Sequence, residues 1–146
     1  MKPLTPTREI IRDCLAVRAR LIARAVSSLY DEAVAVHSIT IAQLNLLAAL
    51  GEVGPCSPRK LGEVLLLERS TVSRNLDLLM AKGLVDAVSS DAKGIREVKL
   101  SSEGEKKIDA VLPAWRAAQK QACELLGTDA ARALRDASGN IWSAPI

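Results

Sequence analysis

The segment 57–100 limits the possible folds of this chain more than any other. Ser57-Pro58 is typical of a helix start, because the serine hydroxyl can cap the helix and proline fits its first turn. This first helix is predicted to be short and to end near Leu66. A second helix is predicted over 69–82, with Gly83 closing it as a left-handed C-cap. Two short helices joined by so tight a turn indicate a helix-turn-helix.

A β-hairpin is predicted directly after the second short helix. The segments 84–88 and 95–100 have strand-like composition, and the six residues between them are small, polar and turn-forming. A hairpin in this position is called a wing. Arg96 has the same parity as the apolar Val98 and Leu100, so alternation alone leaves the direction of its side chain open.

Long amphipathic helices are predicted on both sides of this unit. Over 8–36 the apolar residues recur every three or four positions, which predicts one helix about 40 Å long. A second long helix is expected from about Ser102 to Gly127, kinked or locally broken at Pro113. Helices of this length exceed the needs of a small core, and they usually bury their apolar stripe against a second subunit. The segment 138–146 is expected to be a loose tail.

These elements predict a mainly α fold with a small β-hairpin wing. Residues 38–102 are expected to form a winged helix-turn-helix lobe that binds DNA. Residues 1–37 and 103–146 are expected to form a helical dimerisation region. Thr40 and Gln43 fit a capping box that begins the first helix of the lobe.

Composition narrows the class of protein. Hydrophobic residues make up 49% of the 146 residues and charged residues 25%, which predicts a packed core rather than disorder. A formal net charge of +3 permits binding to nucleic acid without demonstrating it. No segment has the length and hydrophobicity of a signal peptide or a membrane span, so a cytoplasmic protein without a membrane partner is expected.

The sequence gives little support for catalysis or for a metal site. The three cysteines lie far apart and form no Cys-x-x-Cys pair, which argues against a disulfide framework and a zinc site. His37 is the sole histidine, and nothing around it supports a catalytic triad. The expectation is a protein that is not an enzyme and that needs neither a metal nor a cofactor.

The second short helix is the candidate recognition helix. Val72, Leu76 and Leu79 form its core stripe, and a helical wheel places hydroxyls and an arginine on the opposite side of its N-terminal half. Hydroxyls contact phosphates or base edges, arginine pairs with guanine, and a helix N-terminus favours phosphate. A cation at the hairpin tip can reach a minor groove or a flanking phosphate. The residues expected to contact DNA are Ser57, Arg69, Ser70, Thr71, Ser73, Arg74, Lys93 and Arg96.

Several motifs in this order resemble the MarR family of transcriptional regulators. Residues 39–44 resemble the family's L-T-x-x-Q opening, and 57–61 resemble its L-S-x-x-E-L-A helix. Residues 69–74 with 79–85 closely match D-R-S-T-V-T-R-x-x-D-x-L-x-x-K-G-L-V, and 100–104 match L-T-x-x-G. The motifs span nearly half of the chain, and the long flanking helices resemble the family's dimerisation region.

The chain also departs from the family pattern. Lys60 replaces an acidic residue, and Glu68 replaces the aspartate that usually precedes the recognition helix. The wing reads Asp91-Ala92-Lys93, with Gly94 where a second arginine often stands. Wing affinity is therefore expected to be weaker, unless Arg96 compensates.

The resemblance implies a sequence-specific regulator of transcription, expected to be a repressor. It implies a homodimer whose N- and C-terminal helices interdigitate, with two winged lobes that read the half-sites of a pseudo-palindromic operator in double-stranded DNA. It also implies release from DNA by a small phenolic or other aromatic effector that binds between the dimer helices and the lobe.

Two alternatives remain open at this level. Cys14 resembles the sensor cysteine of the family's organic-peroxide branch, which would make the chain a thiol-based oxidative-stress sensor. Cys14 also falls on the apolar stripe, where cysteine acts as a small hydrophobe. The other alternative is a winged-helix adaptor that binds proteins and has lost DNA binding, which the missing wing arginine motivates.

Overall fold

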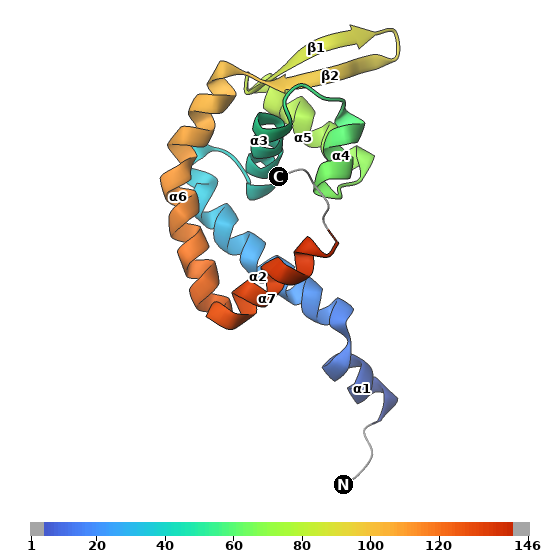
Figure 1. Cartoon of the computed structure of the whole chain (residues 1–146), viewed down its shortest axis with the longest axis vertical. Coiled ribbons are helices and arrows are strands. Elements are labelled where there is room, and N and C mark those ends of the chain that lie inside the picture. Colours follow the sequence, from blue (N-terminus) through green and yellow to red (C-terminus); the bar gives the residue numbers. More distant parts are fainter. Residues whose placement is uncertain (1–4, 142–146) are drawn as a thin grey trace.

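A computed structural model describes residues 5–141 (Figure 1). The described chain is mainly helical and has one antiparallel two-stranded sheet, which confirms the predicted fold class. The elements in chain order are α1 (Pro6–Asp13), α2 (Leu15–Val34), the 3-10 helix η1 (Ala35–His37), α3 (Ile41–Val53), α4 (Pro58–Leu65), α5 (Arg69–Ala81), β1 (Val85–Asp91), β2 (Gly94–Leu100), α6 (Ser102–Leu126) and α7 (Thr128–Gly139).

The prediction of one unbroken helix over 8–36 was wrong. The chain breaks at Cys14, which is extended (φ −68°, ψ 113°) and separates α1 from α2. The Arg18 guanidinium donates to the Arg12 carbonyl across this break at 2.7 Å, which satisfies one of the carbonyl groups at the end of α1. Apolar periodicity missed the break because apolar residues continue on both sides and neither glycine nor proline marks it.

Helix α3 lies at the centre of the winged lobe, which we define as α3 to β2. The predicted capping box begins it: Thr40 Oγ1 accepts from the Gln43 amide and Gln43 Oε1 accepts from the Thr40 amide, both at 3.2 Å. Leu46, Leu47 and Leu50 on α3 are at most 1% exposed. They pack in one core with residues of α4, α5, α6 and both strands, so α3 positions every other element of the lobe.

A tight turn joins α4 to α5. Leu66 adopts the left-handed conformation at φ 53°, and the Leu67 amide donates to the Gly62 carbonyl at 2.9 Å. A Cβ on Gly62 would lie 3.1 Å from the Leu67 carbonyl oxygen, so a small residue is needed where the chain doubles back. The turn sets the angle at which α5 leaves α4.

The wing is longer than predicted, because β1 continues to Asp91 and leaves a two-residue tip. The pairing runs in step from Val85–Leu100 to Ala87–Val98 and then becomes irregular. An isolated bridge between Cys56 and Val98 attaches the segment before α4 to β2, with backbone hydrogen bonds of 3.0 and 2.9 Å. The base of the wing is therefore bound to the lobe, while its tip projects away (Figure 1).

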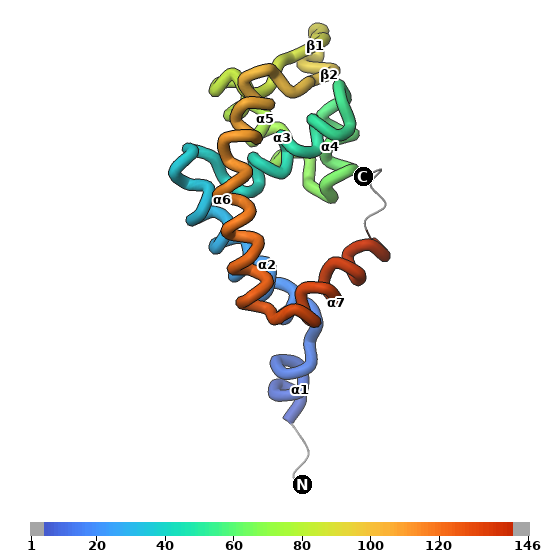
Figure 2. The backbone as a smooth tube through the Cα atoms, turned by 60° about the vertical axis from the view of Figure 1, so that its left-hand side comes forward, coloured from blue at the N-terminus to red at the C-terminus, as the bar shows by residue number. Residues whose placement is uncertain are grey.

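Helix α6 connects the wing to the long helices. Pro113 lies inside it, yet the helix is continuous over 25 residues, so the proline does not end it. Its C-terminal half packs along α2, as both views show (Figures 1 and 2). Tyr30 of α2 is buried there against Ala118 and Ala122, and its ring contacts that of Trp115 at a centroid distance of 6.4 Å.

The C-terminal helix α7 extends into the segment that was expected to be a loose tail. It reaches Gly139, although that tail was expected from Ser138. Residues 142–146 of that tail lie outside the described part. Within 5–141 no single helix is long and apolar enough to cross a membrane. Only Leu15–His37 with Ile41–Val53 meet that criterion, as a pair bent by 79°.

We predict that Gly104→Ala strongly destabilises the lobe. Gly104 lies in the first turn of α6, where an added Cβ would stand 2.3 Å from the Leu84 carbonyl oxygen and 2.6 Å from Leu100 Cδ1. Backbone must move to make room, so the free energy of unfolding should fall by about 1–3 kcal/mol in a urea titration. Gly139→Ala is the matched control, because a Cβ there meets no atom of residues 5–141 within 4 Å. Equal stabilities of the two variants would contradict the packing described.

Candidate nucleic-acid interface

Helix α5 presents a polar face around a buried stripe. Val72, Leu76 and Leu79 are at most 3% exposed and hold the helix against the lobe. The residues predicted to read DNA lie on the rest of its N-terminal half: Arg69, Ser70, Ser73 and Arg74 are exposed, and Thr71 is half-buried. The buried stripe has the four-then-three spacing that the sequence indicated, so α5 cannot rotate without exposing it.

Caps differ between the two helices of the helix-turn-helix. Ser57 caps α4, since its Oγ accepts from the Lys60 amide at 3.1 Å. Glu68 precedes α5 but its side chain makes no capping hydrogen bond. The first backbone N–H groups of α5 therefore receive no hydrogen bond acceptor from the Glu68 side chain. This end of the helix carries the positive end of its dipole and favours an anion.

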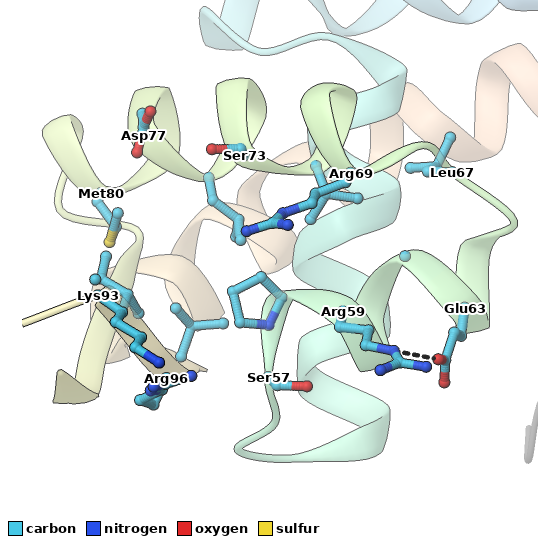
Figure 3. A pocket seen from close by; sticks show the side chains of 17 residues that line it. Ser57, Arg59, Glu63, Leu67, Arg69, Ser73, Asp77, Met80, Lys93 and Arg96 are labelled. Atoms are coloured by element: carbon cyan, nitrogen blue, oxygen red, sulfur yellow. Dashed lines mark hydrogen bonds and ion pairs between the residues drawn. The ribbon is translucent and has the colours of Figure 1, made fainter. Parts of the chain in front are cut away.

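A groove of about 790 Å³ lies between α4, α5 and the wing (Figure 3). It brings together some of the residues predicted to bind DNA, from three separate elements: Ser57, Arg69, Ser73, Lys93 and Arg96. Its floor is apolar and includes Val72, Leu76 and Val98. The groove therefore has basic and hydroxyl groups over a rigid aliphatic base.

The remaining predicted residues do not line this groove. Ser70, Thr71 and Arg74 lie on other sides of α5. A helix that enters a groove of DNA contacts the groove with several of its sides. Polar residues on more than one side of α5 therefore fit a helix inserted into a DNA groove better than an enclosed ligand site.

The cationic side chains around α5 differ in whether they have a partner. Arg59 pairs with Glu63 at 3.0 Å, and both side chains are largely exposed. Within the described residues, no hydrogen bond or ion pair involves the side chains of Arg69, Arg74 and Lys93. Their charge is available to an external anion.

The wing tip is ordered by Asp91. Its Oδ1 accepts from the Lys93 amide at 2.8 Å, and its Oδ2 accepts from Arg96 Nε at 2.6 Å. The strand pairing goes from Ser89–Glu97 to Ser90–Ile95 and so skips Arg96. Arg96 is exposed, lines the groove together with Val98, whose parity it shares, and pairs with Asp91 at the wing tip. The structure thus gives the orientation that alternation left open.

Sequence reasoning missed Arg59, Asp77 and Met80, which also line the groove. The sequence could have identified Arg59, because it follows the Ser57-Pro58 helix start and so lies in the first turn of α4, next to Ser57. Asp77 and Met80 gave no such signal, since their positions on α5 reach the wing only after the hairpin has folded back.

The three cysteines occupy different environments. Cys14 is half-buried at the break between α1 and α2, and Cys123 is half-buried on α6. Cys56 is buried at 8% exposure, and burial together with the nearby Glu97 raises its thiol pKa despite an opposing effect of Lys60. Among residues 5–141 no group of three or more His, Cys, Asp or Glu residues is placed to hold a metal ion.

Comparison with known proteins gives one family and one fold. Residues 37–94 match a model of the MarR family. A probable transcriptional regulator from Pseudomonas aeruginosa is 25% identical, with a TM-score of 0.76 over 90% of this chain and 98% of that chain. The transcriptional regulator MosR from M. tuberculosis is 24% identical, with a TM-score of 0.75 over 88% and 93% of the two chains.

A third similar structure was solved with its nucleic acid. A mutant of MarR from E. coli in complex with operator DNA is 20% identical, with a TM-score of 0.76 over 91% of this chain and 96% of that chain. No curated protein matches the chain. The winged-helix fold with long flanking helices is thus shared with regulators of the MarR family.

We predict that Cys56 resists alkylation in the folded protein at pH 8. Its thiol is buried and its raised pKa lowers the fraction of reactive thiolate. Iodoacetamide treatment followed by peptide mass mapping should show much slower modification of Cys56 in the folded protein than in urea. In urea all three thiols should react alike. Equal rates for Cys56 in the folded and the unfolded protein would refute the burial argument.

Proposed function

We propose that this chain is a sequence-specific transcriptional repressor that binds double-stranded DNA as a homodimer. The premise is that residues 37–94 match the MarR family model and that the described chain shares its fold with a probable transcriptional regulator. One observation carries the proposal: Arg69 and Arg74 on α5 and Lys93 at the wing tip are exposed, and no side chain in the described chain neutralises them. A phosphate backbone is the polyanion that such an arrangement fits.

In the proposed complex the N-terminal half of α5 enters the major groove. Ser70 and Arg74 face base edges there, where arginine can make a bidentate contact to guanine. The groove between α4, α5 and the wing receives the sugar-phosphate backbone, with Ser57 and Arg69 donating to phosphate. Lys93 at the hairpin tip reaches the neighbouring minor groove or its phosphates. A protein of the same fold has been solved in complex with operator DNA, which supports DNA binding by this fold.

A second copy of the chain is needed to cover the long helices. The large apolar residues of α1 and the N-terminal half of α2 are exposed in the single chain: Ile10 is 62% exposed, Ile11 65%, Leu15 82% and Leu21 57%. Leu125 on α6 and Leu134 on α7 are also exposed, at 58% and 45%. Monomeric proteins rarely leave so many large apolar side chains together in solvent. A two-fold dimer through α1, α2, α6 and α7 would bury them and present two lobes to a pseudo-palindrome.

Regulation would act through the same region. We propose that a small aromatic effector, held between the dimer helices and the lobes, shifts the lobes out of register with the operator and releases it. The protein would work in the cytoplasm, without catalysis of its own.

We predict that Arg74→Ala weakens binding to the selected operator by about 1–3 kcal/mol, the loss expected when an arginine contact to a base is removed. The operator is first selected from a duplex library, and binding is then followed by fluorescence anisotropy at two salt concentrations. Arg116→Ala on α6 is the charge-matched control and should bind like the wild type. Wild-type affinity should fall steeply with salt, because phosphate contacts release counterions.

Two results would overturn the DNA-binding proposal. Unchanged operator affinity of Arg74→Ala would remove Arg74 from the interface. Failure of the wild type to select any duplex, together with a flat salt titration, would favour the adaptor that binds proteins.

We predict that Leu15→Asp converts the dimer to a monomer. Leu15 is 82% exposed in the single chain, so a carboxylate is harmless to its fold but costly in a dry interface. Sedimentation velocity should show the change in mass. Leu66→Asp is the control, since Leu66 is also exposed, at 64%, but lies in the turn of the lobe. A monomeric wild type, or a dimeric Leu15→Asp protein, would contradict the proposed interface.

A further inference from the structure

Three side chains from three different helices converge on the connector between α2 and α3. Lys82, the C-cap residue of α5, donates from Nζ to the Ser38 carbonyl at 2.5 Å. Lys107 of α6 donates from Nζ to the His37 carbonyl at 3.1 Å. Asp31 of α2 accepts from the Ile41 amide at 2.7 Å, which fixes the start of α3 against the end of α2.

The backbone of the connector explains why lysines bind there. Helix α2 continues into η1 and ends at Ser38, whose left-handed conformation (φ 56°, ψ 39°) closes the turn. The last carbonyl groups of a helix have no partner within it and carry the negative end of its dipole. An ammonium is the favoured partner for such groups. Lys82 and Lys107 therefore act as C-terminal caps supplied from distant parts of the sequence.

The bond from Lys82 joins two elements with different roles. Its backbone ends α5, the helix whose N-terminal half is proposed to enter the major groove. Its side chain reaches Ser38, which ends the 3-10 helix η1 directly after α2. The exposed apolar residues of α2 are proposed to form the dimer interface. Of the hydrogen bonds in the described chain, this is the one that directly links α5 to the α2–α3 connector.

We propose that Lys82 is a positioning residue that sets the angle of the recognition helix relative to the dimerisation helices, and so makes the protein selective for the spacing between operator half-sites. The inference rests on the proposed function. In a two-fold dimer the separation of the two α5 helices is transmitted through α2, the connector and the lobe. Half-sites one helical turn apart, about 34 Å, are read together only when that path is rigid.

Lys82 does not need to touch DNA for this role. It ends α5 at the opposite end from Arg69 and Ser70, and its ammonium is already bound to the Ser38 carbonyl. Removing its charge should therefore spare the affinity of one lobe for one half-site, while it loosens the coupling between two lobes.

The test uses the full-length protein and a set of duplexes. The duplexes are a single half-site, the selected operator, and operators with one to three base pairs added or removed between the half-sites. Lys82→Met keeps the aliphatic stem and removes the ammonium, Lys82→Arg keeps a donor, and Lys106→Met is the charge-matched control on exposed α6. Hydrogen exchange of residues 35–41, measured without DNA, reports on the connector directly.

We expect Lys82→Met to bind the single half-site within about twofold of wild type, to lose about tenfold on the natural spacing, and to show a flattened spacing profile. Lys82→Arg should restore the profile, and Lys106→Met should retain it. Exchange in the connector should accelerate about tenfold in Lys82→Met only.

An unchanged spacing profile, or a uniform loss on every duplex, would overturn the positioning role. Unchanged connector exchange in Lys82→Met would overturn it whatever the DNA results. A wild type that selects no operator would instead refute the proposed function, and hydrogen exchange would still decide whether Lys82 holds the connector.

Discussion

The burial of α3 is the constraint on which the rest of the structure depends. Its leucines fill a core built almost wholly from Leu, Val and Ile, with no phenylalanine anywhere in the chain. Aliphatic side chains of this size pack densely and tolerate little displacement. Because α4, α5, α6 and both strands contact the same core, α5 and the base of the wing are held at fixed positions relative to each other.

The basic side chains around α5 fall into two groups, those paired with a carboxylate and those without such a pair. The Arg59–Glu63 and Arg96–Asp91 pairs are exposed, and pairs of that kind contribute about 0–1 kcal/mol to stability. They are thus easily rearranged when an anion approaches. Lys93 and Arg74 have no such partner among residues 5–141, and their charge adds to a local field that attracts a polyanion. The Asp91 contact has a second effect, since it stiffens the wing tip that carries Lys93.

The long helices meet the lobe in two ways. Val34 of α2 and Val111 of α6 lie in the lobe core, and the connector after α2 has its carbonyl groups held by lysines from α5 and α6. In the proposed dimer, small changes between the long helices would reach the lobes through both and alter the distance between the two α5 helices.

Local residue patterns predicted much of this protein. The Ser57-Pro58 start, the Thr40 capping box, the core stripe of α5 and the turn-forming hairpin residues depend on neighbours within a few positions, so they can be read along the chain. The break at Cys14, the pairing of Arg96 with Asp91 and the bond from Lys82 to Ser38 were not predicted in this way. No residue pattern marks the break or the irregular strand pairing at Arg96, and the bond from Lys82 joins residues 44 positions apart. Periodicity assigns a residue to a face, whereas only tertiary packing decides which partner that face meets and which charges remain free.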